Sequence, residues 1–139
     1  MKNLRILVVD DHEVVRRGLL ALLGTQAGWE VVGEATNGPD AVKKVALTKP
    51  DVVVMDITMP LMSGLDATRL IMETAPQTKV LIFTMHDSEQ MMQTALEAGA
   101  RGYVLKSNAA NDLISAIRAL AKGESPPLSR APKLPLKIV

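Results

Sequence analysis

Short apolar runs alternate five times along the chain with longer stretches whose apolar positions recur at helical spacing. Three of the runs, Ile6–Val9, Val52–Met55 and Val80–Phe83, are continuously apolar. Such runs predict strands that are buried on both faces of a parallel sheet. Glu30–Ala35 and Arg101–Leu105 are more polar, which favours strands at the edges of that sheet.

The stretches between these strands have one apolar side. Their apolar residues recur three and four positions apart, which is the period of an amphipathic helix. The five sets are Val14, Val15, Leu19, Leu22 and Leu23; Ala41, Val42, Val45 and Ala46; Ala67, Leu70 and Ile71; Met91, Met92, Ala95 and Leu96; and Leu113, Ile114, Ile117, Leu120 and Ala121. We therefore expect five helices that pack their apolar sides on the sheet.

Capping residues indicate where some of these helices begin and end. Ser63 with Asp66, and Asp87 with Gln90, have the spacing of a capping box. Glycines occupy positions that are typical of helix ends. They are Gly24, Gly99 and Gly123.

Five strand–helix units with short links predict right-handed crossovers and an α/β fold of three layers. If the two more polar strands lie at the edges, the strand order is 2-1-3-4-5, the doubly wound (βα)5 arrangement of flavodoxin-like folds. Ligands of such sheets bind at the carboxyl ends of the strands, near the switch point between strands 1 and 3. We expect the functional site at that edge.

Composition divides the chain near Gly123. Residues 1–123 carry 13 basic and 14 acidic side chains, a net charge of −1. Residues 124–139 carry three basic side chains and one acid, and they contain four of the eight prolines and no glycine. We expect a packed domain over 1–123 and a disordered, proline-rich basic tail or linker over 124–139.

Composition also disfavours several classes of protein. The 139 residues include no cysteine, which excludes disulfides and thiolate metal sites. A net charge of +1 and only three aromatic residues argue against a general nucleic-acid binder. The longest apolar run, Leu19–Leu23, is far shorter than a membrane span. We therefore expect a cytoplasmic protein.

Polar and charged residues stand where four of the predicted strands end. Asp10-Asp11 follow strand 1, Asp56 follows strand 3, strand 4 ends near Thr84, and Lys106 follows strand 5. Adjacent strands are about 4.8 Å apart, so the three carboxylates can share one site that the long lysine side chain can reach. Three carboxylates repel one another. The cations that we expect to offset this repulsion are Lys106 and Mg²⁺, which prefers oxygen ligands.

This combination is suited to phosphoryl chemistry. A carboxylate beside Mg²⁺ and an ammonium group can attack phosphorus, while the cations neutralise the phosphoryl oxygens and Thr84 bonds one of them. Each residue alone has an ordinary explanation, because aspartates cap helices and occupy turns, threonine ends strands, and lysine is usually solvated. Only their combination at one sheet edge carries the prediction.

These residues belong to longer motifs: ILVVDDH at 6–12, DVVVMDITMP at 51–60, SGLDA at 63–67, FTMH at 83–86 and GARGYVLK at 99–106. With these motifs, residues 3–123 resemble the response-regulator receiver domain of bacterial two-component signalling. The resemblance implies that Asp56 accepts a phosphoryl group from a phosphohistidine on a sensor histidine kinase. Such a domain catalyses only its own phosphorylation and dephosphorylation.

The resemblance also assigns the neighbouring residues. It implies that Asp10, Asp11, Asp56 and the backbone carbonyl of Thr58 hold Mg²⁺, and that Lys106 pairs with the phosphoryl group.

The resemblance further implies a switch. Thr84 would move to bond the phosphoryl group and Tyr103 would turn inward, which changes the face formed by the fourth helix, fifth strand and fifth helix. Thr58 and His86 would tune how long the phosphoryl group survives. His12 and His86 flank the acidic site, but Mg²⁺ favours oxygen, so the sequence gives little support for a histidine metal ligand.

One departure from the common pattern is informative. Many receivers have proline, often in cis, after the site lysine, whereas this chain has Ser107, for which we expect a trans bond. Together with FTMH and GLDAT at 64–68, this is similar to the NarL/LuxR-type subfamily, whose members usually carry a DNA-binding helix-turn-helix. Such a module needs roughly 45 residues. Residues 124–139 are too few for it, so we expect transcriptional output through DNA only by way of an effector domain outside this chain. We also expect a homodimer on phosphorylation.

Other functions remain open at this stage. The chain could be a stand-alone receiver or an interaction module that keeps the fold without phosphorylation. A Mg²⁺-dependent phosphatase of the haloacid-dehalogenase kind is less favoured, because it needs a second aspartate at the position of Thr58. Flavin binding is weaker still, since few aromatic residues are present to stack on the ring.

Overall fold

The computed structural model describes residues 3–126, which form one parallel sheet of order β2-β1-β3-β4-β5. Val8 lies opposite Val54 of the next strand, and Val54 lies opposite Leu81 of the one after, so the central strands are in parallel register. The predicted α/β fold and strand order are confirmed. The strands are β1 (Leu4–Val9), β2 (Trp29–Ala35), β3 (Val52–Met55), β4 (Lys79–Thr84) and β5 (Gly102–Leu105).

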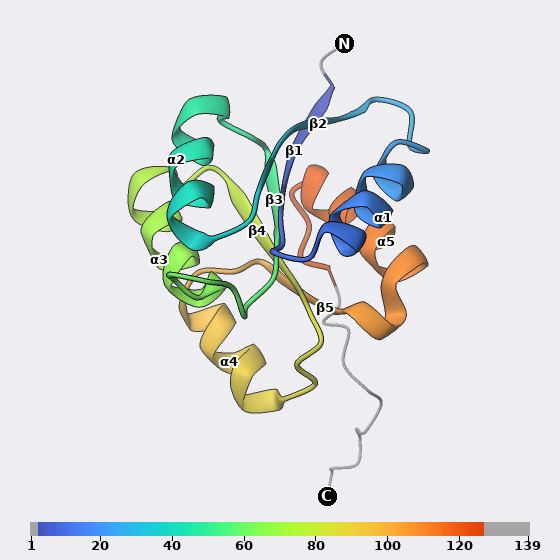
Figure 1. The fold of residues 1–139 in the computed structure, drawn as a ribbon. Helices are drawn as coiled ribbons and strands as arrows, with labels where there is room; N and C mark the ends of the chain where they lie inside the picture. The colour runs from blue at the N-terminus through green and yellow to red at the C-terminus, as the bar shows by residue number, and fades with distance from the viewer. Residues whose placement is uncertain (1–2, 127–139) are drawn as a thin grey trace, which may run out of the picture.

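Five helices cover both faces of the sheet (Figure 1). One face carries the first and last helices, and the other face carries the remaining three. Within residues 3–126 we find no helix that is long and apolar enough to cross a membrane. The helices are α1 (Glu13–Leu23), α2 (Gly38–Thr48), α3 (Gly64–Thr74), α4 (Glu89–Glu97) and α5 (Ala109–Ala121), and the 3-10 turn η1 (Lys106–Asn108) precedes α5.

Alternate residues of a central strand face opposite helix layers. In β1, Ile6 and Val8 join the core beneath α1 and α5, whereas Leu7 and Val9 join the core beneath α2, α3 and α4. All four residues are at most 1% exposed. A strand that is buried on both faces is apolar at every position. This double burial explains why the central strands appear in the sequence as continuous apolar runs.

The two edge strands differ in burial. Most residues of β2 are partly exposed, but Gly102 to Leu105 of β5 are buried throughout. The polar residue of the predicted run, Arg101, is exposed and lies just before the strand. Pro126 is buried, and its Cγ lies 3.2 Å from the place that a Cβ on Gly102 would occupy. The chain after α5 therefore covers the beginning of β5, and residues 127–139 of the predicted tail lie outside the described residues.

One predicted helix start is wrong by a residue. Ser63 caps α3 as expected, with its side chain accepting a hydrogen bond from the Asp66 N–H at 3.2 Å. The cap of α4 is Ser88 and not Asp87, because the Ser88 hydroxyl accepts from the Met91 N–H at 3.1 Å. Both aspartate and serine are favoured N-cap residues, so the sequence spacing could not decide between Asp87 and Ser88.

Candidate functional site

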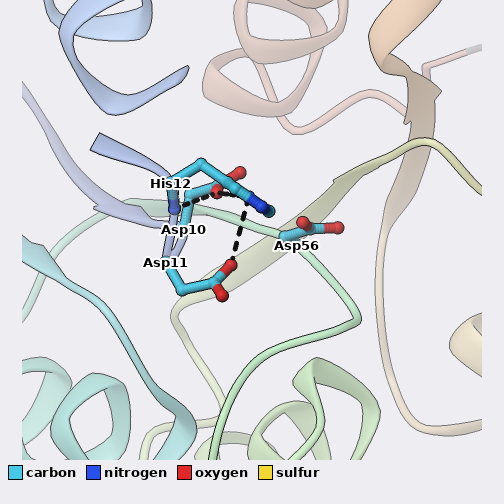
Figure 2. A group of neighbouring side chains, drawn as sticks. All are labelled: Asp10, Asp11, His12 and Asp56. Carbon is cyan, nitrogen blue, oxygen red and sulfur yellow. Dashed lines mark hydrogen bonds and ion pairs between the residues drawn. The ribbon is translucent and has the colours of Figure 1, made fainter. Parts of the chain in front are cut away.

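The carboxyl edge of the sheet brings four charged residues together. Asp10 and Asp11 follow β1, Asp56 follows β3, and Lys106 follows β5. The Lys106 Nζ donates to Asp10 Oδ2 at 2.7 Å and to Asp56 Oδ2 at 3.0 Å. Figure 2 shows the three aspartates around one small space. Parallel register places the ends of β1 and β3 side by side, and the reach of the lysine spans β4.

Two hydrogen bonds to backbone groups and the close packing of α3 hold Asp56 in place. Its N–H donates to Val9 O at 3.1 Å, and its own Oδ1 accepts from the Ile57 N–H at 2.7 Å. The N–H of Gly64 donates to Ile57 O at 2.7 Å. A Cβ at Gly64 would overlap the Asp56 carbonyl oxygen, so only glycine lets α3 begin this close to the strand end. These contacts fix the Asp56 carboxylate while leaving Oδ2 to the lysine.

The charges at this edge do not balance. Asp10 is 1% exposed and Asp56 is 6% exposed, and 11% of the Lys106 side chain is exposed. Burial by itself lowers the pKa of Lys106, but the hydrogen bonds and charges of Asp10 and Asp56 outweigh it and raise that pKa above its usual range. Three carboxylates and one ammonium leave a net charge of −2, which a divalent cation would offset.

The donor set fits such a cation. Asp11 Oδ1 is buried and accepts no hydrogen bond within the described residues, although His12 Nδ1 lies 3.2 Å away as an ion-pair partner. Ligand atoms of Asp10, Asp11, His12 and Asp56 all lie within 4.8 Å of one another. Carboxylate oxygens are the ligands that Mg²⁺ prefers. The residues present therefore suit a hard divalent ion.

The residues that the sequence predicts to switch and to tune the site meet at His86. Its Nε2 lies 2.8 Å from Thr58 Oγ1, and its backbone N–H donates to Thr84 Oγ1 at 3.3 Å. The hydroxyl of Tyr103 donates to His86 O at 2.6 Å, and Tyr103 is fully buried. His86 thus joins the loop after β3, the end of β4 and the middle of β5. The sequence placed these residues near the site, but it gave no sign that one histidine connects them.

Sequence patterns missed a supporting residue, Arg16. Its Nη1 donates to the backbone O of Asp10 at 2.8 Å, and its Nε donates to Glu34 Oε1 at 3.0 Å. Arg16 therefore fixes the turn that presents the first aspartate. A position inside α1 gives no sequence signal for this contact.

The peptide bond between Lys106 and Ser107 is trans, as predicted, and no cis bond occurs anywhere in residues 3–126.

Comparison with known proteins agrees with this geometry. Residues 6–118 match the family model of the response regulator receiver domain. The response regulator protein VraR of Staphylococcus aureus is 42% identical over 123 residues, which are 88% of this chain and 59% of VraR. This chain thus spans less than two thirds of the length of that relative.

Two solved structures have the same fold. A LuxR-family two-component response regulator from Aurantimonas sp. SI85-9A1 matches with a TM-score of 0.86 and 41% identity over 89% of each chain. The receiver domain of a putative NarL response regulator from Mycobacterium tuberculosis matches with a TM-score of 0.85 and 31% identity, over 89% of this chain and all of that one. With its strand order, its acidic edge and these relatives, the chain belongs to the response regulator receiver domain family, and one of the similar solved structures is a LuxR-family regulator.

Proposed function

We propose that this receiver accepts a phosphoryl group on Asp56 from the phosphohistidine of a sensor histidine kinase. The observation that carries the proposal is the environment of the Asp56 carboxylate. One of its oxygens accepts from the Ile57 N–H and the other faces the Lys106 ammonium group at 3.0 Å. A buried carboxylate held in this way has a defined direction of attack and a cation beside the charge that arrives.

The transfer exchanges one bond for another. An Asp56 oxygen forms a bond to phosphorus while the bond from phosphorus to the donor imidazole nitrogen breaks, and that nitrogen keeps the electron pair. Lys106 then pairs with the phosphoryl oxygens. Asp10, Asp11, Asp56 and the backbone carbonyl of Thr58 hold Mg²⁺, which when bound neutralises phosphoryl charge. No further enzymatic activity is needed beyond this transfer and the hydrolysis of the aspartyl phosphate, in which water attacks phosphorus, the Asp56 carboxylate leaves and inorganic phosphate is released.

Phosphorylation switches a surface through the residues that meet at His86. In the proposed switch the Thr84 hydroxyl turns to the phosphoryl group and leaves the His86 N–H, which now donates to it at 3.3 Å. The backbone oxygen of His86 accepts the hydrogen bond from the Tyr103 hydroxyl, so a movement of this loop reaches β5. The face formed by α4, β5 and α5 is the surface that responds. Thr58 and His86 set how long the phosphoryl group survives.

The output of the switch is the control of a partner or of transcription. One of the relatives named above is a LuxR-family response regulator, and the chain covers 59% of VraR. We infer that any contact with DNA is made by an effector domain outside these residues, that phosphorylation favours a homodimer, and that the protein acts in the cytoplasm. A stand-alone receiver is the alternative output.

The experiment that tests the proposal uses a small phosphodonor such as acetyl phosphate. With Mg²⁺, intact-mass spectrometry is expected to detect one added phosphoryl group on the wild type and on an Asp66→Asn control. Asp66 is an exposed acid on α3 that pairs with Arg69. The Asp56→Asn variant is expected to gain nothing. An unmodified wild type would favour the interaction module that needs no phosphorylation. An Asp56→Asn variant that is modified equally would show that another residue accepts the phosphoryl group.

The haloacid-dehalogenase reading gains no support from the site. Such phosphatases need a carboxylic acid two residues after the nucleophile, and that position holds Thr58, whose hydroxyl contacts His86 at 2.8 Å. Sustained turnover of a phosphate ester by the wild type would revive this candidate.

A further inference from the structure

We propose that His12 supplies an imidazole nitrogen to the cation site, so that the site favours Co²⁺ and similar late divalent ions over Mg²⁺ more than a purely oxygen-lined site would. This inference rests on the cation site of the proposed function. It concerns a residue to which the sequence alone gave little metal role. The structure changes that view because of where the ring lies.

The ring of His12 points into the acidic cluster (Figure 2). Its Nδ1 lies 3.1 Å from Asp10 Oδ1 and 3.2 Å from Asp11 Oδ1. Neighbouring ligands around an octahedral ion at about 2.1 Å are separated by about 3 Å. These distances are those of a hydrogen bond and an ion pair, and ligands that share one ion would have the same spacing.

The backbone holds the ring in this direction. The N–H of His12 donates to Asp10 Oδ1 at 2.9 Å, so the main chain and the ring address the same carboxylate oxygen. The other histidine differs, because the His86 Nε2 contacts Thr58 Oγ1. Only one of the two histidines in the sequence is thus placed to serve as a ligand.

A capping role does not explain the ring. His12 is the N-cap residue of α1, and its side chain makes no capping hydrogen bond. About two thirds of the side chain is exposed (65%), and ligation through Nδ1 would require the proton of a neutral imidazole to be on Nε2. The His12 side chain therefore neither caps its helix nor fills the core, and it contacts the two aspartates instead.

The chemistry of the donor sets the preference. Mg²⁺ takes oxygen ligands and gains little from nitrogen. Affinity for nitrogen-containing sites rises through the first-row series from Mn²⁺ to Cu²⁺, and imidazole is a common ligand of those ions. Three carboxylates alone would bind both kinds of ion, so the imidazole acts on the ratio of the two affinities.

The test compares binding of Co²⁺ and Mg²⁺ by isothermal titration in the wild type, His12→Asn and His12→Ala. Asparagine is a favoured N-cap, so His12→Asn keeps the start of α1 without the imidazole. We expect the Co²⁺ affinity to fall about tenfold or more in both variants. The Mg²⁺ affinity is expected to change less than about threefold, because oxygen ligands remain. A Glu73→Gln control removes an exposed acid near the end of α3 and is expected to bind like the wild type.

A spectroscopic readout separates ligation from a change of fold. In the proton NMR spectrum of the Co²⁺-loaded wild type, we expect a hyperfine-shifted, exchangeable imidazole N–H signal that is missing in both His12 variants. An unchanged Co²⁺ affinity, or tighter Co²⁺ binding once the ring is removed, would overturn the inference while Mg²⁺ binding stands. If the wild type binds neither ion, the cation site of the proposed function itself fails.

Discussion

Gly64 offers the sharpest test of how the Asp56 carboxylate is positioned. It is the first residue of α3 and packs on the backbone of Asp56. A Cβ here would overlap the Asp56 carbonyl oxygen, and it would lie 2.9 Å from the Asp56 carbonyl carbon and 3.1 Å from Ile57 Cα. These neighbours are backbone atoms that cannot rotate away. In a Gly64→Ala variant the start of α3 and the end of β3 therefore have to separate.

Two effects set the size of the loss. Overpacking against a well-packed site costs about 1–3 kcal/mol. Separation also weakens the hydrogen bond from the Gly64 N–H to Ile57 O, now 2.7 Å long, which contributes about 1 kcal/mol net. We expect the free energy of unfolding to fall by about 2–4 kcal/mol and the melting temperature to fall by roughly 10 °C. Phosphorylation is expected to slow as well, because the Asp56 carboxylate shifts with its backbone.

The measurement is urea unfolding followed by the fluorescence of Trp29, the single tryptophan. Gly18→Ala is the matched control, since it is the same substitution inside α1 and its Cβ would meet no atom within 4 Å. That control is expected to gain about 0.5–1 kcal/mol, because alanine loses less backbone freedom than glycine in a helix. If both variants unfold at the wild-type urea concentration or above it, the close packing of α3 on Asp56 is not what requires glycine.

Three further predictions concern the charged and hydrogen-bonded neighbours. Lys106→Met is expected to lose about 2–4 kcal/mol of unfolding free energy at neutral pH, because two buried carboxylates lose their cation. Added Mg²⁺ should recover part of the loss. A variant as stable as the wild type would contradict a stabilising role of the two ion pairs. Since the folded-state pKa of Lys106 is raised from 10.5, its contribution is complete below that value and is lost as the pH rises through the raised pKa. Unfolding series at several pH values check this, and a wild-type advantage that already shrinks between about pH 7 and pH 9 would refute the assignment. Arg16→Ala is expected to lower the free energy of unfolding by about 1–3 kcal/mol and to weaken Mg²⁺ binding in titrations. The control Arg17→Ala breaks an exposed pair with Glu13 and should lower the free energy of unfolding by under about 0.5 kcal/mol. Equal losses in the two variants would count against the contact between Arg16 and the Asp10 carbonyl. Tyr103→Phe is expected to cost about 1 kcal/mol in urea unfolding because His86 O loses its donor, and an unchanged midpoint would show that this bond contributes nothing.

The fold and the placement of the acidic edge were predictable because they follow from burial and topology. Val52–Met55 is buried at every position, and that is visible as a continuous apolar run. Once parallel order is inferred, the residues after β1, β3 and β5 must share one edge. Asp10, Asp56 and Lys106 could therefore be grouped without any knowledge of loop conformation.

The remaining features depend on side-chain directions and loop paths that no periodicity encodes. Arg16 reaches back to the Asp10 carbonyl only because the turn before α1 brings that carbonyl beside the helix. The His12 ring could equally have pointed to solvent, and His86 could have faced the acidic cluster instead of Thr58. The cap of α4 at Ser88 was missed for the same reason, since adjacent polar residues compete for one amide. The burial of Pro126 against β5 also lay beyond a reading based on composition.

Two sets of contacts can transmit the effect of a charge added at Asp56 to β5. Lys106 donates directly to the Asp56 carboxylate, and Tyr103, three residues earlier, donates to His86 O in the loop after β4. The same histidine contacts Thr58 in the loop after β3. The end of β3 is therefore linked to β5 once by charge and once by hydrogen bonds. A phosphoryl group that draws on both Lys106 and Thr84 would act on β5 at two points, whereas a change of charge alone would act only through the lysine. A receiver with the Thr84 hydroxyl removed should for that reason still be phosphorylated while passing on only part of the signal.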